Sequence, residues 1–545
     1  MKKINKFVVA AWLALTFSTT VVWAGSEKLS SDLQSVKRSD TVEAIVQYRV
    51  PPTDAHHQKI AQLGGKLQRK LDFIKGAHYT VPASALQTLA DDPDVAYISP
   101  DRPLQASFDQ ITDGTVYSNA VNSNGYKGAG VGVAIIDSGI VDLPDFHSGS
   151  TDRIVYQQSF VGGTPADQYG HGTHVAGILA GNGNGTVYIG TAPQANIINL
   201  RVLDVNGAGT DSNVIAAIQT AISLQSQYNI RVINLSLGRP VYESASLDPL
   251  DQAVEAAWKA GITVVVAAGN EGRNNTANTE GYGTIGAPGN DPYAITVGCV
   301  KSEGTTVRTD DLIASYSSKG PTLYDHYVKP DLIAPGNLIV STLPTGLTLS
   351  NLYPANRVTG NYFTLSGTSM ATPVVAAAAA MAYQADPYIT PDQVKAVLMA
   401  SSSKNNFPAS SVAVDPVTKI SYTSYYDIFT IGAGELDLYT ASQIGSLPSG
   451  SAKSPSVAYN STTGQVTLQG ISGANVVWGS NVVWGSNVVW GSSVLLANNV
   501  VWGSNVVWGT SSMTGFNVVW GSNVVWGTTS TDASESMGIA VNGEQ

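Results

Sequence analysis

Cysteine is almost absent, since Cys299 is the single cysteine among 545 residues. One cysteine cannot form a disulfide within the chain. An exported protein of this composition must therefore owe its stability to a hydrophobic core, bound ions or a high barrier to unfolding. Cys299 lies in an apolar run at 294–300, where a cysteine behaves as a small buried hydrophobe. We assign it no chemistry.

Charge is also scarce. Only 13% of the residues are charged, and the formal net charge is −11. An acidic chain repels phosphate groups, which excludes nucleic acid and anionic membranes as general partners. The 43% of hydrophobic residues can fill at least one large core, and the length exceeds one ordinary domain, so we expect several modules. The 54 glycines and 24 tyrosines favour a loop-rich extracellular protein.

Long apolar runs are missing beyond the first residues. Three lysines precede an apolar stretch at 7–17, and small residues follow as far as Ala24. This pattern predicts a signal peptide at 1–24. The alternative, a membrane anchor, needs about 20 apolar residues, more than this stretch provides. We expect a secreted, extracellular product and leave association with the cell surface open.

A small domain is expected at 25–108. Between 42 and 98 the apolar residues predict a strand, a helix, two strands, a helix and a strand. This order is typical of a ferredoxin-like α+β domain.

The central region, 109–445, alternates apolar strands with helices. Such a pattern predicts an α/β fold with a mostly parallel, doubly wound sheet covered on both faces. Ligands of such sheets bind beyond the carboxyl ends of the strands. An Ala-rich stretch without charge predicts a buried helix at 374–385. The other expected elements are strands at 132–136, 196–202, 232–235 and 263–268, and helices at 173–180, 214–226 and 250–259.

Three residues of this region suit nucleophilic hydrolysis, which needs a hydroxyl, a base and an acid that orients the base. Asp137 follows a buried strand, although Asp-Ser-Gly is also ordinary in turns. His171 stands at the mouth of a helix. A zinc site with His174 would require a Glu between the two histidines, so we interpret His171 as the base and His174 as structural. Ser369 precedes the Ala-rich helix. An isolated serine at such a position is often a helix cap. The free backbone N–H groups and the helix dipole at this end would also stabilise an oxyanion next to Ser369.

Together these segments resemble the signature motifs of the subtilisin-like serine peptidases, which follow in the order Asp, His, Ser. The resemblance spans 108–442 and includes Asn-Leu-Ser-Leu-Gly at 234–238 and Ala-Ala-Gly-Asn-Glu-Gly at 267–272. It implies a serine endopeptidase whose catalytic triad is Asp137, His171 and Ser369. It also implies that Asn270 and the N–H group of Ser369 bind the oxyanion.

The chain departs from the family pattern at two positions near Ser369. Thr372 stands where Ser is common, and Val374 stands where His is common. Neither residue takes part in the expected mechanism.

The same resemblance implies a site for an extended peptide, whose main chain pairs with two segments and gives affinity with little sequence choice. Gly286 is expected at the floor of the first specificity pocket, where a missing side chain leaves room for Leu, Phe or Tyr. We expect broad specificity with this preference. The pairing residues are Ser236, Leu237, Gly238, Ala267, Ala268 and Gly269.

Residues 42–101 resemble the inhibitory pro-region of these enzymes. The resemblance implies that the domain at 25–108 acts as an intramolecular inhibitor, occupying the substrate site until the enzyme removes it. The expected cut lies between Gln105 and Gln110.

A calcium site is a further implication of the resemblance. Asn182 and Asn184 fall where the family has a calcium loop, and Asp145 matches its carboxylate ligand; oxygen ligands suit this ion. A polar Gly/Asn turn without an ion explains the loop equally well. We expect catalysis itself to need no cofactor.

A Ser/Gly-rich linker at 446–474 leads to a repetitive tail at 475–545, in which Asn-Val-Val-Trp-Gly-Ser or Thr occurs seven times. Each copy predicts a strand and a turn, and an even period can align the tryptophans in one row. Such a row can bind a polymer or a cell surface. A structural or disordered tail, trimmed during maturation, explains the repeat at least as well.

Two functions follow from the sequence. The first is endoproteolysis, with proteins or peptides as substrates. The second is a catalytically silent adhesive or structural surface protein that uses the tryptophan repeat.

Overall fold

The computed structural model divides the chain into two compact units, residues 1–105 and 106–545. Across the described residues, helices are too short or too polar to cross a membrane. The predicted signal peptide and the tryptophan repeats fall outside the described residues. The structure describes residues 28–29, 33, 36–71, 75–100, 122, 124–275, 279–403, 407–415, 418–445, 450–460, 465–469 and 543–544.

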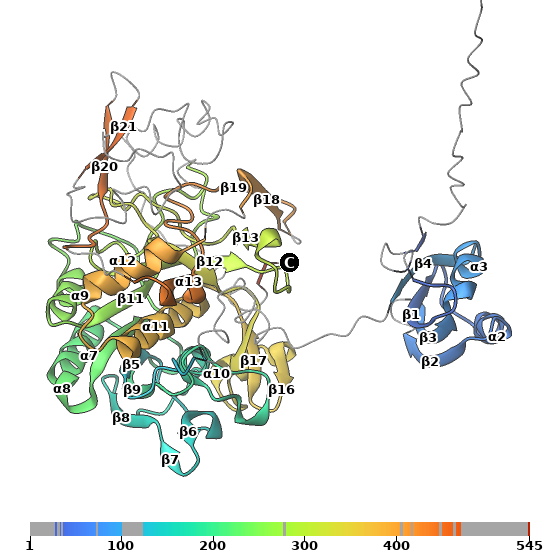
Figure 1. Ribbon diagram of the computed structural model, residues 1–545, viewed down its shortest axis with the longest axis horizontal. Helices are drawn as coiled ribbons and strands as arrows, with labels where there is room; N and C mark the ends of the chain where they lie inside the picture. Colours follow the sequence, from blue (N-terminus) through green and yellow to red (C-terminus); the bar gives the residue numbers. More distant parts are fainter. Residues whose placement is uncertain are drawn as a thin grey trace, which may run out of the picture. The chain divides into compact units, whose positions relative to one another are not determined.

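In its described residues, the first unit has a four-stranded antiparallel sheet with two α-helices (Figure 1). Its elements are β1 (Thr41–Tyr48), α2 (Asp54–Gln62), β2 (Lys66–Leu71), β3 (Gly76–Pro82), α3 (Leu86–Ala90) and β4 (Val95–Pro100). The strands lie in the order β2-β3-β1-β4. Val46, Tyr79 and Ile98 of the sheet are buried with Ile60 of α2 and Leu89 of α3. The elements follow along the chain in the order that the sequence pattern predicts.

The second unit is built on a mostly parallel sheet. Its strands are β5 (Gly132–Asp137), β8 (Ile154–Ser159), β9 (Asn196–Arg201), β10 (Ile230–Leu235), β11 (Thr263–Ala267), β12 (Ile295–Lys301), β13 (Leu312–Ile313) and β14 (Leu332–Pro335). They are ordered β13-β12-β11-β10-β5-β9-β8, and β14 also pairs with β12. Among these pairs, β12 and β13 are antiparallel. The α/β class with a parallel sheet is thus confirmed.

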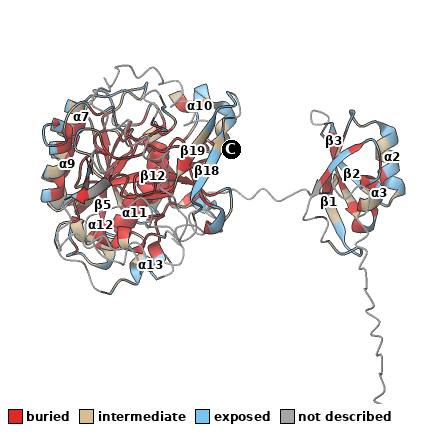
Figure 2. Cartoon of the chain, turned by 90° about the horizontal axis from the view of Figure 1, so that it is seen from above, coloured by how far each residue is buried: buried red, intermediate tan, exposed pale blue. Residues whose placement is uncertain are grey.

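Helices cover both faces of this sheet. They include α6 (His171–Ala180), α7 (Asp211–Ser223), α9 (Pro249–Lys259) and α11 (Thr368–Ala385). Val133 and Ile135 of β5 lie in the core shared with α6 and α11, whereas Ala134 and Ile136 lie in the core shared with α7 and α9. Successive side chains of a strand point to opposite faces, so a strand buried on both faces must be apolar throughout. Figure 2 shows β5, β12 and α11 within the buried interior.

Two helices begin earlier than the apolar pattern predicts. α6 begins at His171 instead of 173, and α11 begins at Thr368 instead of 374. Gly170 (φ 116°) and Gly367 (φ 141°) precede them, in conformations that glycine adopts without a steric penalty. Polar residues in these first turns conceal the helical period. As a result, both His171 and Ser369 lie in the first turn of a helix.

Smaller elements complete the second unit. Within the stretch predicted as a linker, the structure has a β-hairpin, and Ala452, Ser454 and Val457 are buried. The remaining elements are β6 (His147–Ser148), β7 (Thr151–Asp152), α8 (Gln225–Tyr228), β15 (Ile339–Thr342), α10 (Thr348–Leu352), β16 (Arg357–Thr359), β17 (Tyr362–Leu365), α12 (Pro391–Ser401), β18 (Ser410–Val414), β19 (Ser421–Tyr425), α13 (Leu438–Ser442), β20 (Ser456–Asn460) and β21 (Gln465–Gln469).

Candidate active site

Asp137 and His171 form a hydrogen-bonded pair at the carboxyl end of β5, in which Asp137 is buried and His171 is partly exposed. Asp137 ends the strand and is only 1% exposed. The Nδ1 atom of His171 lies 2.8 Å from Oδ1 and 3.0 Å from Oδ2 of Asp137. Burial lowers the pKa of His171, but the charge and hydrogen bond of Asp137 outweigh it and hold the pKa above its usual value of 6.5. The carboxylate therefore orients the ring through Nδ1, which leaves Nε2 to exchange a proton with another group.

A second carboxylate, Asp167, organises the chain in front of His171. It accepts hydrogen bonds from the N–H groups of Gly170 (2.8 Å) and Thr173 (3.0 Å) and from the hydroxyl of Ser138 (2.9 Å). These bonds tie the turn after β5 to the first turn of α6. The role of Asp167 could not be predicted from the sequence, because a lone acidic residue four positions before His171 carries no recognisable motif.

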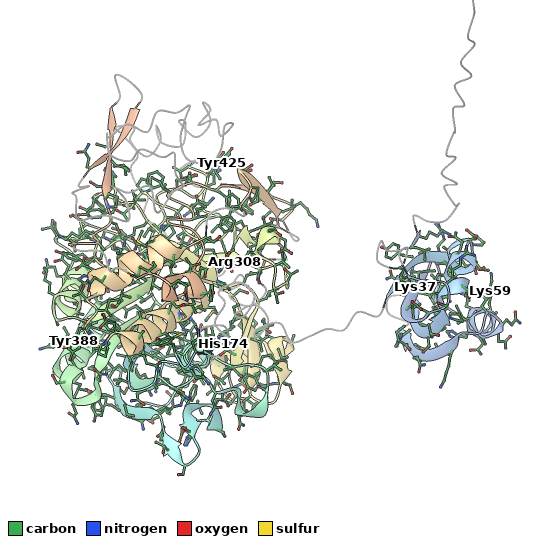
Figure 3. The ribbon with its side chains drawn as sticks, viewed as in Figure 1. Lys37, Lys59, His174, Arg308, Tyr388 and Tyr425 are labelled. Atoms are coloured by element: carbon green, nitrogen blue, oxygen red, sulfur yellow. The ribbon has the colours of Figure 1, made fainter. Side chains whose placement is uncertain are left out.

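His174 has no part in this pair. It is buried, and its Nε2 atom lies 2.9 Å from the carbonyl oxygen of Phe363. Burial lowers the pKa of His174 to about 3, so the ring is neutral. Figure 3 labels it inside the second unit, whereas Tyr388, also labelled, is 91% exposed. This placement agrees with the structural role that the sequence suggests.

Ser369 is held against the residue that follows β10. Its hydroxyl donates to the carbonyl oxygen of Ser236 at 3.2 Å, and the hydroxyl of Ser236 donates to the carbonyl oxygen of Ser369 at 2.8 Å. Pro373, four residues later in α11, has no N–H group for that second carbonyl. Ser236 therefore supplies the hydrogen bond that the proline removes from the helix.

The strand register brings Asp137 and Ser236 to the same edge of the sheet. β5 and β10 are parallel neighbours, with Ile135 opposite Asn234. Asp137 and Ser236 each lie two residues further on, at the ends of strands that are about 4.8 Å apart. The Asp137–His171 pair and the hydroxyl of Ser369 thus share the carboxyl edge, where parallel sheets bind ligands.

Asn270 lies beside the start of α11. Its Oδ1 atom accepts hydrogen bonds from the N–H group (2.9 Å) and the hydroxyl (3.1 Å) of Thr368. Because Oδ1 is held there, the Nδ2 amide is the end of the side chain that can donate to a substrate oxygen. The role of Thr368 could not be predicted from the sequence, although it directly precedes Ser369, because nothing local reveals its contact with Asn270.

The segments expected to bind substrate lie next to one another. Residues 236–238 continue β10, and 267–269 end β11 and follow it. Gly286 donates its N–H group to the carbonyl oxygen of Ala268 at 3.1 Å, and Ala287 exchanges two backbone hydrogen bonds with Arg239 (2.8 and 2.9 Å). A Cβ atom on Gly286 would lie 3.0 Å from the carbonyl oxygen of Arg239. The structure thus brings all the predicted substrate-binding residues to neighbouring positions.

The predicted calcium ligands are close in space, and side-chain oxygen atoms of Asp145 and Asn182 already have protein partners. A carboxylate oxygen of Asp145 accepts the hydroxyl of Tyr362, which also lies 2.9 Å from the carbonyl oxygen of Gly183. The side-chain oxygen of Asn182 accepts the N–H group of Asn184 at 2.7 Å. These groups do not form a cage of unpaired oxygen ligands in this arrangement.

A neighbouring surface cluster brings ligand atoms of Asp142, His147 and Asp152 within 4.8 Å of one another. The Nε2 atom of His147 already lies 2.6 Å from Asp142. Exposed acidic clusters are common without a metal, and we assign none here.

Comparison with known proteins decides the family. The Subtilase family of peptidases matches residues 128–415. The chain belongs to this family. Serine protease AprX from Bacillus subtilis (strain 168) is 37% identical over 355 residues, which cover 62% of this chain and 76% of AprX. Subtilisin E from the same organism is 34% identical over 391 residues, 70% of this chain and 91% of that protein.

One further relative points the same way. The Extracellular serine proteinase of Thermus sp. (strain Rt41A) is 36% identical over 343 residues, 61% of this chain and 72% of that protein. The crystal structure of a cold adapted subtilisin-like serine proteinase matches with a TM-score of 0.39 and 32% identity, covering 51% of this chain and 85% of the other. As a subtilase, the protein is a serine-type endopeptidase, a hydrolase of peptide bonds.

Proposed function

We propose that Ser369 is the nucleophile of this subtilase, His171 its general base and Asp137 the carboxylate that orients the base. The observation that carries the proposal is the hydrogen-bonded Asp137–His171 pair at the strand edge where Ser369 is also held. Nε2 of His171 takes the proton of the Ser369 hydroxyl as Oγ attacks the peptide carbonyl, and then returns it to the leaving amine. Water hydrolyses the resulting acyl-enzyme by the same steps.

The oxyanion of each tetrahedral intermediate is stabilised by two donors. One is the Nδ2 amide of Asn270, whose oxygen is fixed by Thr368. The other is the backbone N–H group of Ser369 in the first turn of α11, where the helix dipole favours negative charge.

The substrate is an extended stretch of protein or peptide chain that pairs with 236–238 and 267–269. Main-chain pairing gives broad specificity, and Gly286 at the floor of the first pocket favours Leu, Phe or Tyr before the cleaved bond. A peptide-library profile tests this; cleavage confined to acidic residues would contradict it.

The enzyme is made as a secreted zymogen. The unit with the ferredoxin-like element order, up to residue 105, is the inhibitory pro-region, removed by self-cleavage between Gln105 and Gln110. The Thermus relative carries the word extracellular in its name, which supports secretion. Sequencing the mature amino terminus tests the position of the cut.

Calcium is not part of the proposed mechanism. The resemblance to the family implies a calcium site, and it implies that catalysis needs no cofactor. Because the oxygen atoms of Asp145 and Asn182 already accept hydrogen bonds, these residues do not fit the ion as they stand. No catalytic step involves it, and calcium binding stays a prediction of the sequence.

The tryptophan repeat has a separate role, attachment to a polymer or a cell surface. This stays a prediction, because the repeat lies outside the described residues. A silent adhesive protein is not favoured as the overall function, since the relatives are named as proteases. Equal binding of full-length and truncated protein to cell-wall polymer would contradict the attachment role.

Casein hydrolysis by the secreted protein, compared with Ser369→Ala, tests the proposed mechanism. We expect the wild type to digest casein and to lose its pro-region, while Ser369→Ala does neither. Ser442→Ala, which removes an exposed hydroxyl on α13, is the matched control and behaves as wild type. Equal activity of Ser369→Ala and the wild type would contradict the assignment of the nucleophile.

A further inference from the structure

Glu544 is far from the catalytic residues in sequence, but it is buried against the peptidase fold. Its side chain is only 4% exposed. One carboxylate oxygen accepts both the N–H group (2.8 Å) and the hydroxyl of Ser315 and lies 3.1 Å from Arg273. The other lies 3.6 Å from Lys301. Two cations and two hydrogen-bond donors therefore surround one carboxylate, so the pocket is selective for an acidic side chain.

The backbone of Glu544 is also recognised. The side-chain amide of Asn337 donates to its carbonyl oxygen and accepts from its N–H group, both at 2.8 Å. A single asparagine thus satisfies both backbone groups, as a neighbouring strand would do.

The preceding residue, Gly543, is selected by space and conformation. It has φ 62°, and a Cβ atom there would lie 2.5 Å from Leu338 and 2.7 Å from the hydroxyl of Ser366. Every other residue would clash in this position, so the site accepts a glycine followed by a glutamate. Ser366, which accepts a hydrogen bond from the N–H group of Leu338, belongs to the segment that leads to Ser369. Figure 1 marks this end of the chain beside β13.

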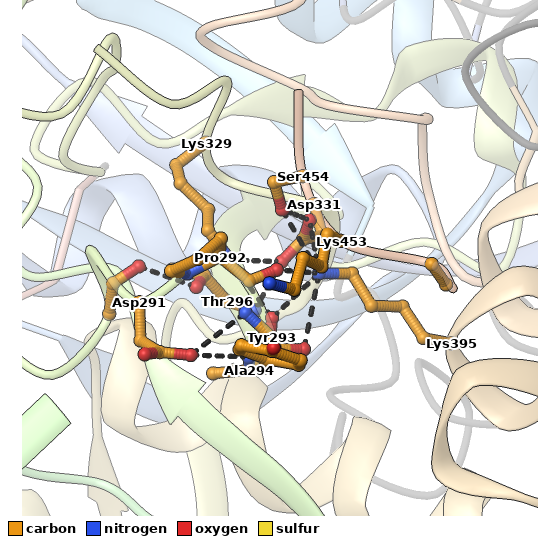
Figure 4. A network of polar contacts seen from close by, with 12 residues as sticks. Asp291, Pro292, Tyr293, Ala294, Thr296, Lys329, Asp331, Lys395, Lys453 and Ser454 are labelled. Carbon is orange, nitrogen blue, oxygen red and sulfur yellow. Dashed lines mark hydrogen bonds and ion pairs between the residues drawn. The ribbon is translucent and has the colours of Figure 1, made fainter. Parts of the chain in front are cut away.

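The chain is anchored to the same unit before the repeats as well. The hydroxyl of Ser454 donates to Asp331 at 2.6 Å and accepts from Lys395 at 3.0 Å, and all three residues are buried (Figure 4). Lys453 lies over the ring of Tyr293, 4.0 Å from its centre. The repeats are thus connected at both ends to residues fixed on the peptidase fold.

We propose that Arg273, Lys301, Ser315 and Asn337 form a binding site for a Gly-Glu sequence, and that its occupant is Gly543–Glu544 of the same chain. The site fastens the far end of the repeat region to the peptidase unit, so that the region forms a closed loop. A cut within the repeats therefore leaves the distal fragment bound. Each cation of the site also has a second acidic partner: Arg273 lies 3.4 Å from Asp415, and Lys301 lies 2.7 Å from Glu303.

The test cuts the full-length chain once and asks whether the distal fragment stays. A cleavage sequence for a heterologous, sequence-specific endopeptidase is inserted between residues 530 and 531, in Ser369→Ala to prevent self-digestion. After cutting, gel filtration and mass spectrometry show whether the fragment elutes with the large unit. We expect it to be retained with the natural sequence and with the control Glu535→Gln, and released with Glu544→Gln.

Competition with synthetic peptides avoids any effect of the substitutions on folding. A peptide of residues 539–545, Ile-Ala-Val-Asn-Gly-Glu-Gln, displaces the fragment from the cut protein. Peptides with Gly543→Ala or Glu544→Gln require a concentration higher by about tenfold or more, because they lose the fit at glycine or the charge-assisted bonds.

Three results would overturn the proposal. Release of the natural fragment shows that the site does not hold Gly543–Glu544. Equal retention of natural and Glu544→Gln fragments shows that the carboxylate is not recognised. A dimer by light scattering before the cut, lost in Glu544→Gln, assigns the site to the segment of a second copy instead of the same chain.

Discussion

The hydroxyl of Ser236 donates a hydrogen bond of 2.8 Å to the carbonyl oxygen of Ser369. In an ordinary helix that carbonyl would bind the N–H group four residues later, but Pro373 occupies that position. The residue after β10 therefore completes the first turn of α11. It does so at the backbone of the proposed nucleophile, where a small displacement affects both attack and oxyanion binding.

Ser236→Ala should lower both stability and activity. It leaves the partly buried carbonyl of Ser369 without its donor, at an expected cost of about 1 kcal/mol in the free energy of unfolding. We expect kcat to fall more than KM rises, because the substitution shifts the nucleophile instead of the substrate-binding backbone. Urea unfolding and steady-state kinetics with a chromogenic peptide measure the two effects. Wild-type values for both would show that Pro373 is compensated in another way.

Asn270→Ala removes a donor that acts on the transition state. We expect kcat to fall by about 100- to 1000-fold with little change in KM. Thr368→Val removes the hydroxyl but keeps the N–H bond to Asn270, so it should cause a smaller loss of the same kind. Thr220→Val, which deletes a hydroxyl on α7, is the matched control. Equal kcat for Thr368→Val and this control would mean that the hydroxyl does not position Asn270.

The pH profile should report His171. Its pKa is held above 6.5 by Asp137, and the neutral ring is the base, so kcat/KM should rise with pH through a midpoint above 6.5. In Asp137→Asn the raising charge is lost and the acidic limb moves to lower pH, while kcat falls about 10⁴-fold. The variant is released from its pro-region at an inserted heterologous cleavage site. An unchanged acidic limb in Asp137→Asn would contradict the role of this pair.

The same raised pKa has a consequence for folding. Protonated His171 is favoured in the folded state, so this group adds stability that is fully present below pH 6.5 and is lost as pH rises through the folded pKa. The sign is opposite to that of the activity profile, so measurements of unfolding and of rate at the same pH values can be compared directly.

The sequence predicts what is encoded in contiguous residues. The apolar run of β5 predicts a strand buried on both faces, and Asp137, His171 and Ser369 stand in motifs short enough to recognise. The starts of α6 and α11 were missed, because Gly170 and Gly367 set them by conformation and not by apolar period.

Contacts between distant residues could not be predicted in this way. Asp167 accepts hydrogen bonds from backbone groups of other segments. Arg273 pairs with Glu544, which lies 271 positions later in the chain. A single sequence carries no local signal for such pairs, since each partner alone looks like an ordinary polar surface residue.

The hydroxyl of Tyr362 lies between Asp145 and the carbonyl oxygen of Gly183, where the sequence predicts a calcium site. Burial raises the pKa of Asp145, and the hydrogen bond from Tyr362 opposes that rise. Because the hydroxyl of Tyr362 already donates a hydrogen bond to the carboxylate of Asp145, the carboxylate does not need a cation as a partner. Chelation should therefore leave the melting temperature of the protein unchanged. Tyr362→Phe should cost about 1–3 kcal/mol, because a buried carboxylate loses its donor.

Calorimetry with and without chelator measures both effects, with Tyr388→Phe at the surface as the matched control. A melting temperature of the wild type that falls on chelation would show that the loop opens to take the ion. In that case Tyr362 must move away from Asp145, and Tyr362→Phe should bind calcium at least as tightly as the wild type.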